Sequence, residues 1–170
     1  RDVVGSRGLG DVYKRQDLRR RDFTINAMAY SHETGIVDIF GGAEDLAARR
    51  IRCVGDAGER FTEDALRILR AVRFSAQLGF SIEKKTWQAL CELAPSLVHV
   101  SKERVQVELT KTLLSDRPEF IWKTEAAGLA PYISKTFPEV FAAWKKQKSC
   151  AKQSLDCLLY TSPSPRDPKT

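Results

Sequence analysis

The stretch that decides the fold is residues 62–78, TEDALRILRAVRFSAQL, which Gly79 follows. At the helical period its apolar side chains fall on one stripe, as in a helix that packs one face against a core. A glycine after such a stretch often ends the helix, because it adopts a left-handed backbone without strain. The sequence therefore predicts one amphipathic helix through the stretch, with a core stripe of Ala65, Ile68, Leu69, Val72 and Ala76.

The charged residues Asp64, Arg67, Arg70 and Arg73 recur at every third position of this stretch, on the side opposite the core stripe. One acid followed by arginines on a rigid helix is suited to holding a planar, anionic ligand such as a nucleoside triphosphate. The ordinary alternative is a solvated ion pair between residues three apart, which stabilises a helix by only about 0.3 kcal/mol. The other motifs of the chain decide between these two interpretations.

A second informative stretch is residues 19–27, RRRDFTINA. Its arginines, Arg20 and Arg21 among them, can neutralise phosphate and bind it bidentately. Asn26 can both donate to and accept from a sugar hydroxyl. The alternative for Asp22 is a purely local role, because Asp22 or Thr24 can cap a short helix that the sequence predicts over residues 25–29.

The order of the predicted elements gives a mainly α fold of the α+β class. Residues 36–40 (IVDIF) alternate and are rich in β-branched side chains, which predicts a short strand. Residues 51–54 (IRCV) predict a second strand, a candidate hairpin partner of the first. After residue 58 every predicted element is a helix. The expected outline is a short helix with two short strands, followed by an all-helical part.

Composition limits the class of protein. Of the 170 residues 42% are hydrophobic, which suits a packed core. The net charge of +6 is a mild pointer to a polyanionic partner, but the two ends carry half of it, so basicity alone argues little. No apolar run reaches the roughly 18 residues that span a bilayer, so we expect no membrane partner. None of the cysteines has CxxC spacing, so neither a zinc site nor a disulfide framework is indicated, and a cytoplasmic location is expected. The four cysteines are Cys53, Cys91, Cys150 and Cys157.

The two ends share no periodicity with the middle of the chain. Residues 1–16 (RDVVGSRGLGDVYKRQ) and 157–170 (CLLYTSPSPRDPKT) resemble translated sequencing-adapter sequence. The alternative is a native glycine-rich loop and a Ser/Pro-rich disordered tail. We treat both segments as non-native and exclude them from fold reasoning.

Three motifs follow one another through the middle: RRDFTINA at residues 20–27, DIFGGAEDL at 38–46 and EDALRILRAVRF at 63–74. Together they resemble the class II nucleotidyltransferases, which comprise the CCA-adding tRNA nucleotidyltransferases and the bacterial poly(A) polymerases. The resemblance extends from residue 17 to about residue 140. The NAMA and EDALR variants are more similar to the CCA-adding branch, since a poly(A) polymerase more often has proline where Ala65 stands.

The resemblance implies a domain organisation and a set of substrates. Residues 17–58 correspond to the C-terminal part of a nucleotidyltransferase head, and residues 59–156 to a helical neck and body. Residues 38–46 match a hinge between head and neck. The implied substrates are CTP, ATP and tRNA, to which CCA is added at the 3′ end. The predicted nucleotide-binding residues are Arg20, Arg21, Asp22, Asn26, Asp64, Arg67, Arg70 and Arg73.

In this family Asp64 and Arg67 match a protein template that selects the incoming base, and hydrogen bonding supports that role. Cytosine and adenine each present an amino donor beside a ring-nitrogen acceptor, to which a carboxylate beside a guanidinium is complementary. Uracil and guanine present the reverse order. Each buried group left unpaired costs about 1–3 kcal/mol, so one Asp–Arg pair can accept C and A and reject U and G.

The reaction implied by the resemblance is attack of an RNA 3′-hydroxyl on the nucleotide α-phosphate, assisted by two metal ions. These ions, Mg²⁺ in the full-length enzyme, need a carboxylate pair that belongs upstream of residue 17, where adapter-like sequence stands. We therefore expect no catalytic or metal-binding residue in this chain, and a fragment that is inactive by itself. Two alternatives remain open: a fragment of a bacterial poly(A) polymerase, and a non-catalytic helical RNA-binding module.

Overall fold

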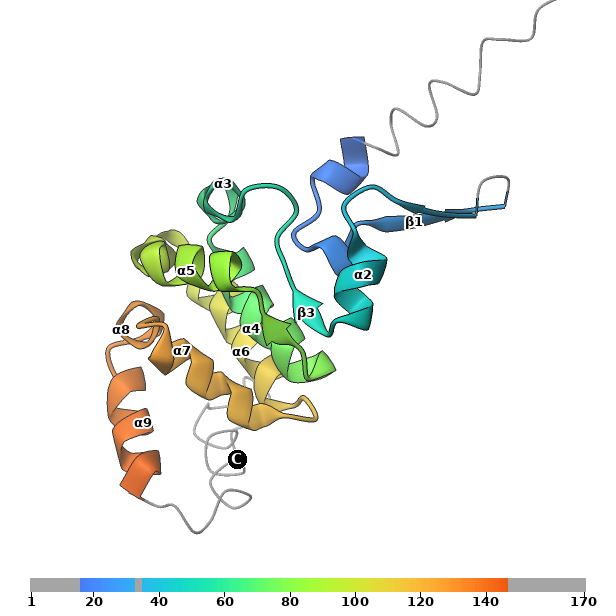
Figure 1. The fold of residues 1–170 in the computed structure, drawn as a ribbon. Coiled ribbons are helices and arrows are strands. Elements are labelled where there is room, and N and C mark those ends of the chain that lie inside the picture. The colour runs from blue at the N-terminus through green and yellow to red at the C-terminus, as the bar shows by residue number, and fades with distance from the viewer. Residues whose placement is uncertain (1–15, 33–34, 147–170) are drawn as a thin grey trace, which may run out of the picture.

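The computed structural model describes residues 16–32 and 35–146, so all of the segment 1–16 but its last residue, and all of the segment 157–170, both expected to be non-native, lie outside it. The described chain is mainly helical with a few short strands, which confirms the predicted fold class (Figure 1). A helical turn at residues 16–19 comes first. The later elements are η1 (Thr24–Asn26), β1 (Met28–Ser31), β2 (Gly35–Asp38), α2 (Gly42–Ala47), β3 (Arg50–Ile51), α3 (Ala57–Glu63), α4 (Leu66–Leu78), β4 (Ser81–Ile82), α5 (Lys84–Glu92), η2 (Ala94–His99), α6 (Lys102–Leu113), η3 (Pro118–Ile121), α7 (Trp122–Ala126), α8 (Ala130–Ile133) and α9 (Phe137–Lys146).

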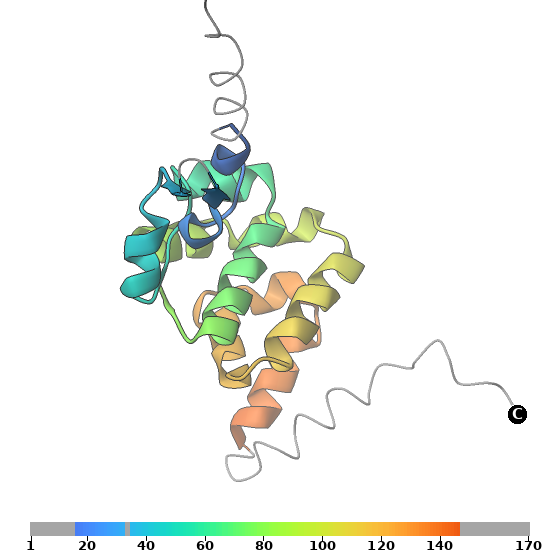
Figure 2. The same ribbon diagram turned by 90° about the vertical axis from the view of Figure 1, so that its right-hand side faces the viewer.

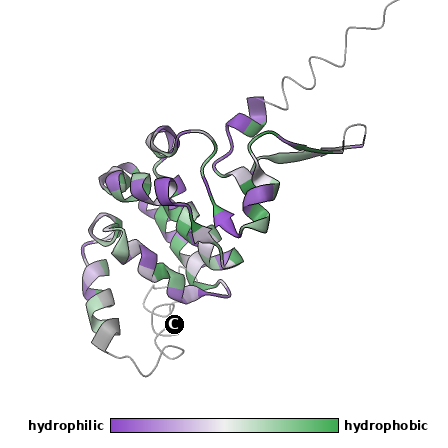
Figure 3. Cartoon of the chain, viewed as in Figure 1, coloured by the Kyte–Doolittle hydropathy of each residue, from purple (hydrophilic) through white to green (hydrophobic). Residues whose placement is uncertain are grey.

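Helix α4 lies at the centre of the helical part, and α3, α6, η3 and α7 pack against it (Figures 1 and 2). The predicted core stripe is confirmed for Ile68, Leu69, Val72 and Ala76, which are each at most 1% exposed, whereas Ala65 is only partly buried against the same core. Apolar residues accordingly gather along α4 in the interior of the helical part (Figure 3). The helix ends at Gly79, whose φ of 68° is the left-handed conformation expected there.

The predicted single helix over residues 62–78 is wrong in one respect, because the chain breaks it in two. Helix α3 ends at Glu63, and Asp64 has an extended backbone with φ −149° and ψ 103°. Helix α4 begins two residues later. The reason is local hydrogen bonding: the Asp64 carboxylate accepts from the Leu66 amide at 3.1 Å and so caps the new helix. Asp64 therefore stands at a corner between two helices.

The predicted short helix over residues 25–29 is also wrong. Only Thr24–Asn26 form a 3₁₀ turn, and Met28–Ser31 form strand β1. This strand pairs antiparallel with β2, with Tyr30 opposite Ile36. Pairing with β2 thus outweighs the helical preference of the NAMA sequence, as tertiary context often does. The resulting hairpin projects from the body of the molecule (Figure 1).

The second strand, predicted over residues 51–54, is found at Arg50–Ile51, and its partner is not the first strand. Arg50–Ile51 pair parallel with Ser81–Ile82, so the part after residue 58 is not entirely helical. Beyond this pair, the Thr24 amide donates to the Arg52 carbonyl at 3.0 Å and the Val54 amide to the Asp22 carbonyl at 3.1 Å. These backbone hydrogen bonds bring the RRD motif alongside the segment that leads into α3.

Residues 38–46, the expected hinge, are held by two carboxylates. Asp38 accepts from the first amides of α2, those of Gly42 and Ala43, both at 2.8 Å. The pKa of Asp38 is lowered, because these backbone hydrogen bonds outweigh the opposing effect of burial. Asp45 is fully buried and ties α2 to η1 and to β3. The segment is thereby fixed to the elements on either side of it.

Gly42 is predicted to be intolerant of any side chain, because a Cβ there would lie 2.2 Å from the backbone oxygen of Thr24. We expect Gly42→Ala to lower the free energy of unfolding by about 2 kcal/mol, a typical cost of overpacking. Urea denaturation measures this change. Gly58→Ala is the matched control: it also lies in a helix, its Cβ would meet only the Asp56 side chain at 3.1 Å, and alanine favours helix. Equal stability of the two variants would contradict the prediction.

Candidate functional site

A cavity of about 410 Å³ lies where the RRD segment meets the corner between α3 and α4. Its volume is in the range of small-molecule sites. Seven of the eight residues predicted from the sequence line it, and they come from two stretches more than 30 positions apart. Four arginines against two aspartates favour an anionic ligand. The lining residues are Arg20, Arg21, Asp22, Asn26, Asp64, Arg67 and Arg70.

Asp22 and Arg70 join the two stretches of the cavity. The Arg70 Nε and Nη2 atoms both lie 2.6 Å from Asp22 Oδ2. The other oxygen of Asp22 accepts from the Phe23 amide at 3.0 Å, and Asp22 is only 7% exposed. A buried carboxylate that accepts from a charged donor at one oxygen and from a backbone amide at the other is held firmly. Asp22 thus fixes the Arg70 guanidinium at the cavity wall.

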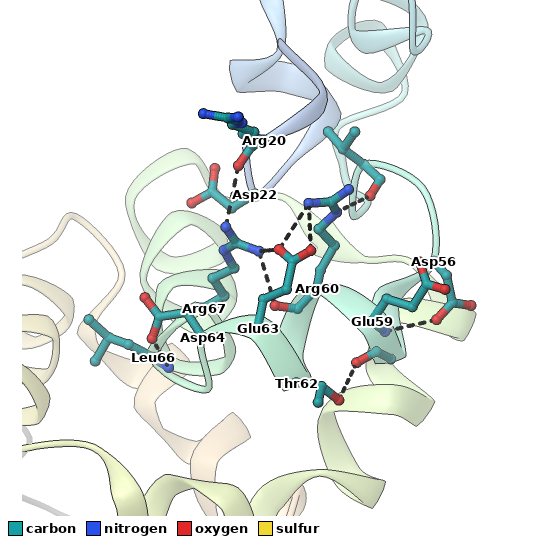
Figure 4. A network of polar contacts seen from close by, with 12 residues as sticks. Arg20, Asp22, Asp56, Glu59, Arg60, Thr62, Glu63, Asp64, Leu66 and Arg67 are labelled. Atoms are coloured by element: carbon teal, nitrogen blue, oxygen red, sulfur yellow. Dashed lines mark hydrogen bonds and ion pairs between the residues drawn. The ribbon is translucent and has the colours of Figure 1, made fainter. Parts of the chain in front are cut away.

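Arg67 is held by the residues around it, as Figure 4 shows. Its Nη1 atom donates to Glu63 Oε2 at 2.6 Å and to the Arg60 carbonyl at 3.1 Å, and its Nη2 atom to the Arg20 carbonyl at 3.3 Å. The Arg67 hydrogen bond is the main reason why the pKa of Glu63 is lowered. Arg67 therefore presents a guanidinium whose orientation is already set.

Asp64 faces the same cavity but has different partners. Its Oδ1 atom caps α4 through the Leu66 amide, and its Oδ2 atom accepts from Arg104 Nη2 at 2.9 Å. The side chain is 34% exposed. Asp64 and Arg67 both line the cavity, yet each bonds to a third residue. The carboxylate and guanidinium thus stand side by side around one space, an arrangement that can receive a ligand edge with both a donor and an acceptor.

Arg73 is the one predicted site residue that the structure places elsewhere. Its Nε atom lies 2.7 Å from Glu108 Oε2, and the two side chains are 12% and 6% exposed. Its guanidinium also lies over the Phe74 ring, 4.3 Å from the centroid. Burial lowers the pKa of Arg73. Arg73 therefore joins α4 to α6 in the interior rather than lining the cavity.

Two residues beside the site were not predicted. Arg60 donates through Nε to the Val54 carbonyl at 3.0 Å and through Nη1 to Glu63 at 2.9 Å, which supports the residue that holds Arg67. Arg104 reaches Asp64 from helix α6, 40 positions along the chain. The spacing of Arg60 before the EDALR motif is a local signal that could have indicated its role. Arg104 gives no such signal, because its contact depends on how α6 packs against α4.

The described residues do not form a metal site. Within residues 16–32 and 35–146, no three or more His, Cys, Asp or Glu side chains are grouped so that they could hold a metal ion. Asp22, an acid of the cavity, already has both oxygens bonded to Arg70 and the Phe23 amide. In the same ranges, no helix has both the length and the apolar character to cross a bilayer.

Two family models match the chain in succession. Residues 9–52 match the "Poly A polymerase head domain", and residues 79–142 match the "Probable RNA and SrmB-binding site of polymerase A". The first match begins inside the segment that we expect to be non-native. The expected domain boundaries at residues 16 and 58 therefore remain predictions.

Curated relatives are CCA-adding enzymes. The chain is 57% identical over 102 residues to that of Leuconostoc mesenteroides, which covers 60% of the chain and 25% of the relative. It is 44% identical over 135 residues to that of Oceanobacillus iheyensis, covering 77% of the chain and 34% of the relative. The chain thus spans about a quarter to a third of the length of these relatives.

Solved structures agree with these relatives. The Bacillus stearothermophilus CCA-adding enzyme in complex with CTP matches with a TM-score of 0.69 at 44% identity, over 71% of this chain and 31% of that one. The Thermotoga maritima CCA-adding enzyme complexed with tRNA matches with a TM-score of 0.65 at 33% identity, over 70% and 30%. The CCA-adding relatives are similar to this chain in sequence and fold, and two family models match it. This chain therefore belongs to the poly(A) polymerase family of nucleotidyltransferases.

Proposed function

We propose that this chain is part of a CCA-adding tRNA nucleotidyltransferase and forms the site that selects the incoming nucleotide. The substrates are CTP, ATP and a tRNA 3′ end. The observation that carries the proposal is the 410 Å³ cavity, which gathers four arginines and two aspartates from two distant motifs. The similarity to an enzyme whose structure is described as a complex with CTP supports it.

Each part of the nucleotide has suitable partners around the cavity. Arg20, Arg21 and Arg70 suit the triphosphate, because guanidinium groups bind phosphate oxygens bidentately. Asn26 is exposed and suits a ribose hydroxyl. Asp64 and Arg67 suit the base: the carboxylate accepts from the amino group of cytosine or adenine, and the guanidinium donates to the adjacent ring nitrogen.

In the proposed reaction the RNA 3′-hydroxyl oxygen bonds to the α-phosphorus of the nucleotide and pyrophosphate leaves. Arg20, Arg21 and Arg70 hold the triphosphate, while Asp64 and Arg67 decide which base is accepted. The family's reaction requires a divalent cation, for which the described residues offer no fitting group. We therefore assign nucleotide binding and selection to these residues, and no step of proton or metal chemistry. A cytoplasmic location, where tRNA is processed, belongs to the same proposal.

A poly(A) polymerase fragment is the second candidate, since both family models are named after polymerase A. It differs from the first in nucleotide choice, because poly(A) addition uses ATP and not CTP. A helical RNA-binding module without nucleotide binding is a third candidate, supported by the RNA-binding family model over residues 79–142.

Titration of the chain with CTP, ATP, UTP and GTP by isothermal calorimetry separates these functions. We expect CTP and ATP to bind at least about tenfold more tightly than UTP and GTP, because UTP or GTP would leave a polar group of the site unpaired. Binding of ATP alone would favour the poly(A) polymerase. Absence of nucleotide binding, with RNA binding retained, would favour the RNA-binding module.

A further inference from the structure

A further cavity, of about 590 Å³, lies among the segment after β2, the residues between β3 and α3, and the start of α5. We call it the α5 cavity. It shares no lining residue with the 410 Å³ candidate site. The two are nevertheless close, because Asp22 lines the candidate site and Thr24, two residues later, lines the α5 cavity. Its volume is in the range of small-molecule sites, and the proposed function does not use it.

Part of the lining of the α5 cavity is apolar. Cys53 is 3% exposed and Ala57 8%, and Ala89 of α5 is half-buried. Burial raises the pKa of the Cys53 thiol to about 12, so the thiol stays neutral at pH 7. Phe40 adds an aromatic residue, which is held by a 2.9 Å hydrogen bond from Arg52 Nη2 to its carbonyl. Small apolar groups beside an aromatic residue suit the flat face of a nucleobase.

The charged residues of this lining differ in whether they already have partners. Arg52 donates to Asp45 at 2.7 Å. Glu83 and Asp56 each accept from an amide in the first turn of a helix, at 2.8 and 2.9 Å. The Lys85 side chain is exposed and forms no hydrogen bond or ion pair with another described residue. Its ammonium group is therefore the point of this lining at which an anion can bind.

These groups together suit a nucleotide with a single phosphate. Within the part of the chain that the structure describes, Glu83 Oε1 and Asp56 Oδ2 accept no hydrogen bond, so each can accept from the amino group of a base. Lys85 can pair with one phosphate. The candidate site differs in this respect, because its four arginines suit a triphosphate. One free cation suits the single phosphate of a nucleotide within an RNA strand.

From this lining we infer that the α5 cavity holds one unpaired nucleotide of the RNA substrate, with its base against Phe40 and its phosphate at Lys85. The inference rests on the proposed function, which supplies RNA as the partner. An RNA whose 3′ end lies at the candidate site can place another nucleotide of the same strand here, because the two cavities are close. RNA binding would then involve residues on both sides of residue 79, where the RNA-binding family model begins.

The test measures binding of a tRNA that lacks its terminal CCA to the chain at several KCl concentrations. One phosphate contact on a single strand adds about 0.7 to the slope of log affinity against log salt. We expect Lys85→Ala to reduce the slope by that amount, and hence to lower the affinity roughly fivefold at about 0.1 M KCl.

Lys84→Ala is the matched control for the charge. It removes the same charge from the preceding exposed position of α5, which does not line the cavity. We expect it to leave both the slope and the affinity close to those of the wild type. Equal falls in the two variants would indicate a diffuse attraction of RNA to α5 and would overturn the inference.

Ala89→Leu tests whether a base enters the cavity. The larger side chain fills part of the space, and we expect the affinity for the tRNA to fall about tenfold, as the loss of one stacked base predicts. Gln88→Leu adds the same side chain at an exposed position outside the lining and should have no such effect. Urea denaturation establishes that both variants fold. Wild-type affinity in a folded Ala89→Leu would contradict the inference.

Titration with AMP distinguishes a nucleotide of RNA from a free nucleotide. If Lys85→Ala and Ala89→Leu weaken AMP binding but not tRNA binding, the cavity takes a free nucleotide and the assignment to RNA is wrong. A wild type that does not bind tRNA would contradict the proposed function together with this inference. If all variants bind tRNA as the wild type does, only this inference is wrong, since the preference for CTP over UTP tests the candidate site separately.

Discussion

Replacing Asp64 with alanine is expected to admit UTP to a site that rejects it. The carboxylate repels uracil O4 and accepts from the amino group of cytosine, so its removal takes away both effects. Each is worth about 1–3 kcal/mol, and we expect the preference for CTP over UTP to fall by a factor of ten or more. Affinity for the triphosphate should change much less, because Arg20, Arg21 and Arg70 remain.

The measurement is the incorporation of CTP and UTP by the full-length enzyme that contains this segment, together with nucleotide binding by the chain. Alanine also removes the cap on the Leu66 amide, at a cost of about 1 kcal/mol of stability. Asp64→Asn keeps that cap and is the sharper variant. Its amide can donate to uracil O4, so it should accept UTP without loss of fold. Asp116→Ala removes an acid from an exposed position and serves as control. Unchanged exclusion of UTP in both Asp64 variants would refute base selection by this residue.

Replacing Asp45 with alanine is expected to cause a large loss of stability. The carboxylate is fully buried and accepts from Thr24 Oγ1 at 2.6 Å, from Arg50 Nε at 2.7 Å and from Arg52 Nε at 2.7 Å. Its removal leaves a buried hydroxyl and two guanidinium groups without their partner. We expect the free energy of unfolding to fall by about 3 kcal/mol, since breaking a buried ion pair is costly and these arginines are partly exposed.

The neighbouring Glu44 provides the matched control. It also approaches Arg50, at 3.7 Å, but its side chain is 79% exposed. Glu44→Ala should therefore cost less than about 0.5 kcal/mol. Urea denaturation of both variants at pH 7 measures the difference. A loss in Asp45→Ala as small as that in Glu44→Ala would show that the Asp45 network contributes little.

The hydrogen bonds of Asp45 also predict that the stability of the folded state depends on pH. Burial by itself raises the pKa of Asp45, but the hydrogen bonds from Thr24, Arg52 and Arg50 outweigh it and hold the pKa below its ordinary value of 3.8. A carboxyl group with a lowered pKa in the folded state adds stability above its unfolded pKa. That stability is lost as the pH falls below 3.8 towards the folded pKa. The difference in stability between wild type and Asp45→Asn should thus be constant near pH 7 and shrink in acid.

Local patterns accounted for much of the fold. The core stripe of α4 and the end of that helix at Gly79 follow from the spacing of apolar residues and from the backbone freedom of glycine. The alternating stretch predicted as a strand over residues 36–40 forms a strand at Gly35–Asp38. The predicted helix over residues 25–29 failed because of pairing between strands. Residues 28–31 pair with this strand and so form a strand themselves, although their own preference is helical.

The sequence singled out residues that lie together in the structure, but it did not give their mutual arrangement. Seven of the eight residues that the sequence singled out line one cavity, and their role in binding a nucleotide stays a prediction. Their bonding partners could not be predicted. Asp22 bonds to Arg70, 48 positions away, and Arg73 turns inward to Glu108. Helical spacing gives the side of the helix on which a residue lies, but not what packs against that side.

The sequence by itself determined the family, the apolar stripe of the central helix and the residue types that gather around the cavity, because periodicity and short motifs are local properties of the chain. The tertiary structure alone decided that Arg104 of α6 holds the Asp64 carboxylate and that Arg73 is buried. These features depend on how α6 packs against α4, and that packing is set by contacts between residues 35 to 40 positions apart.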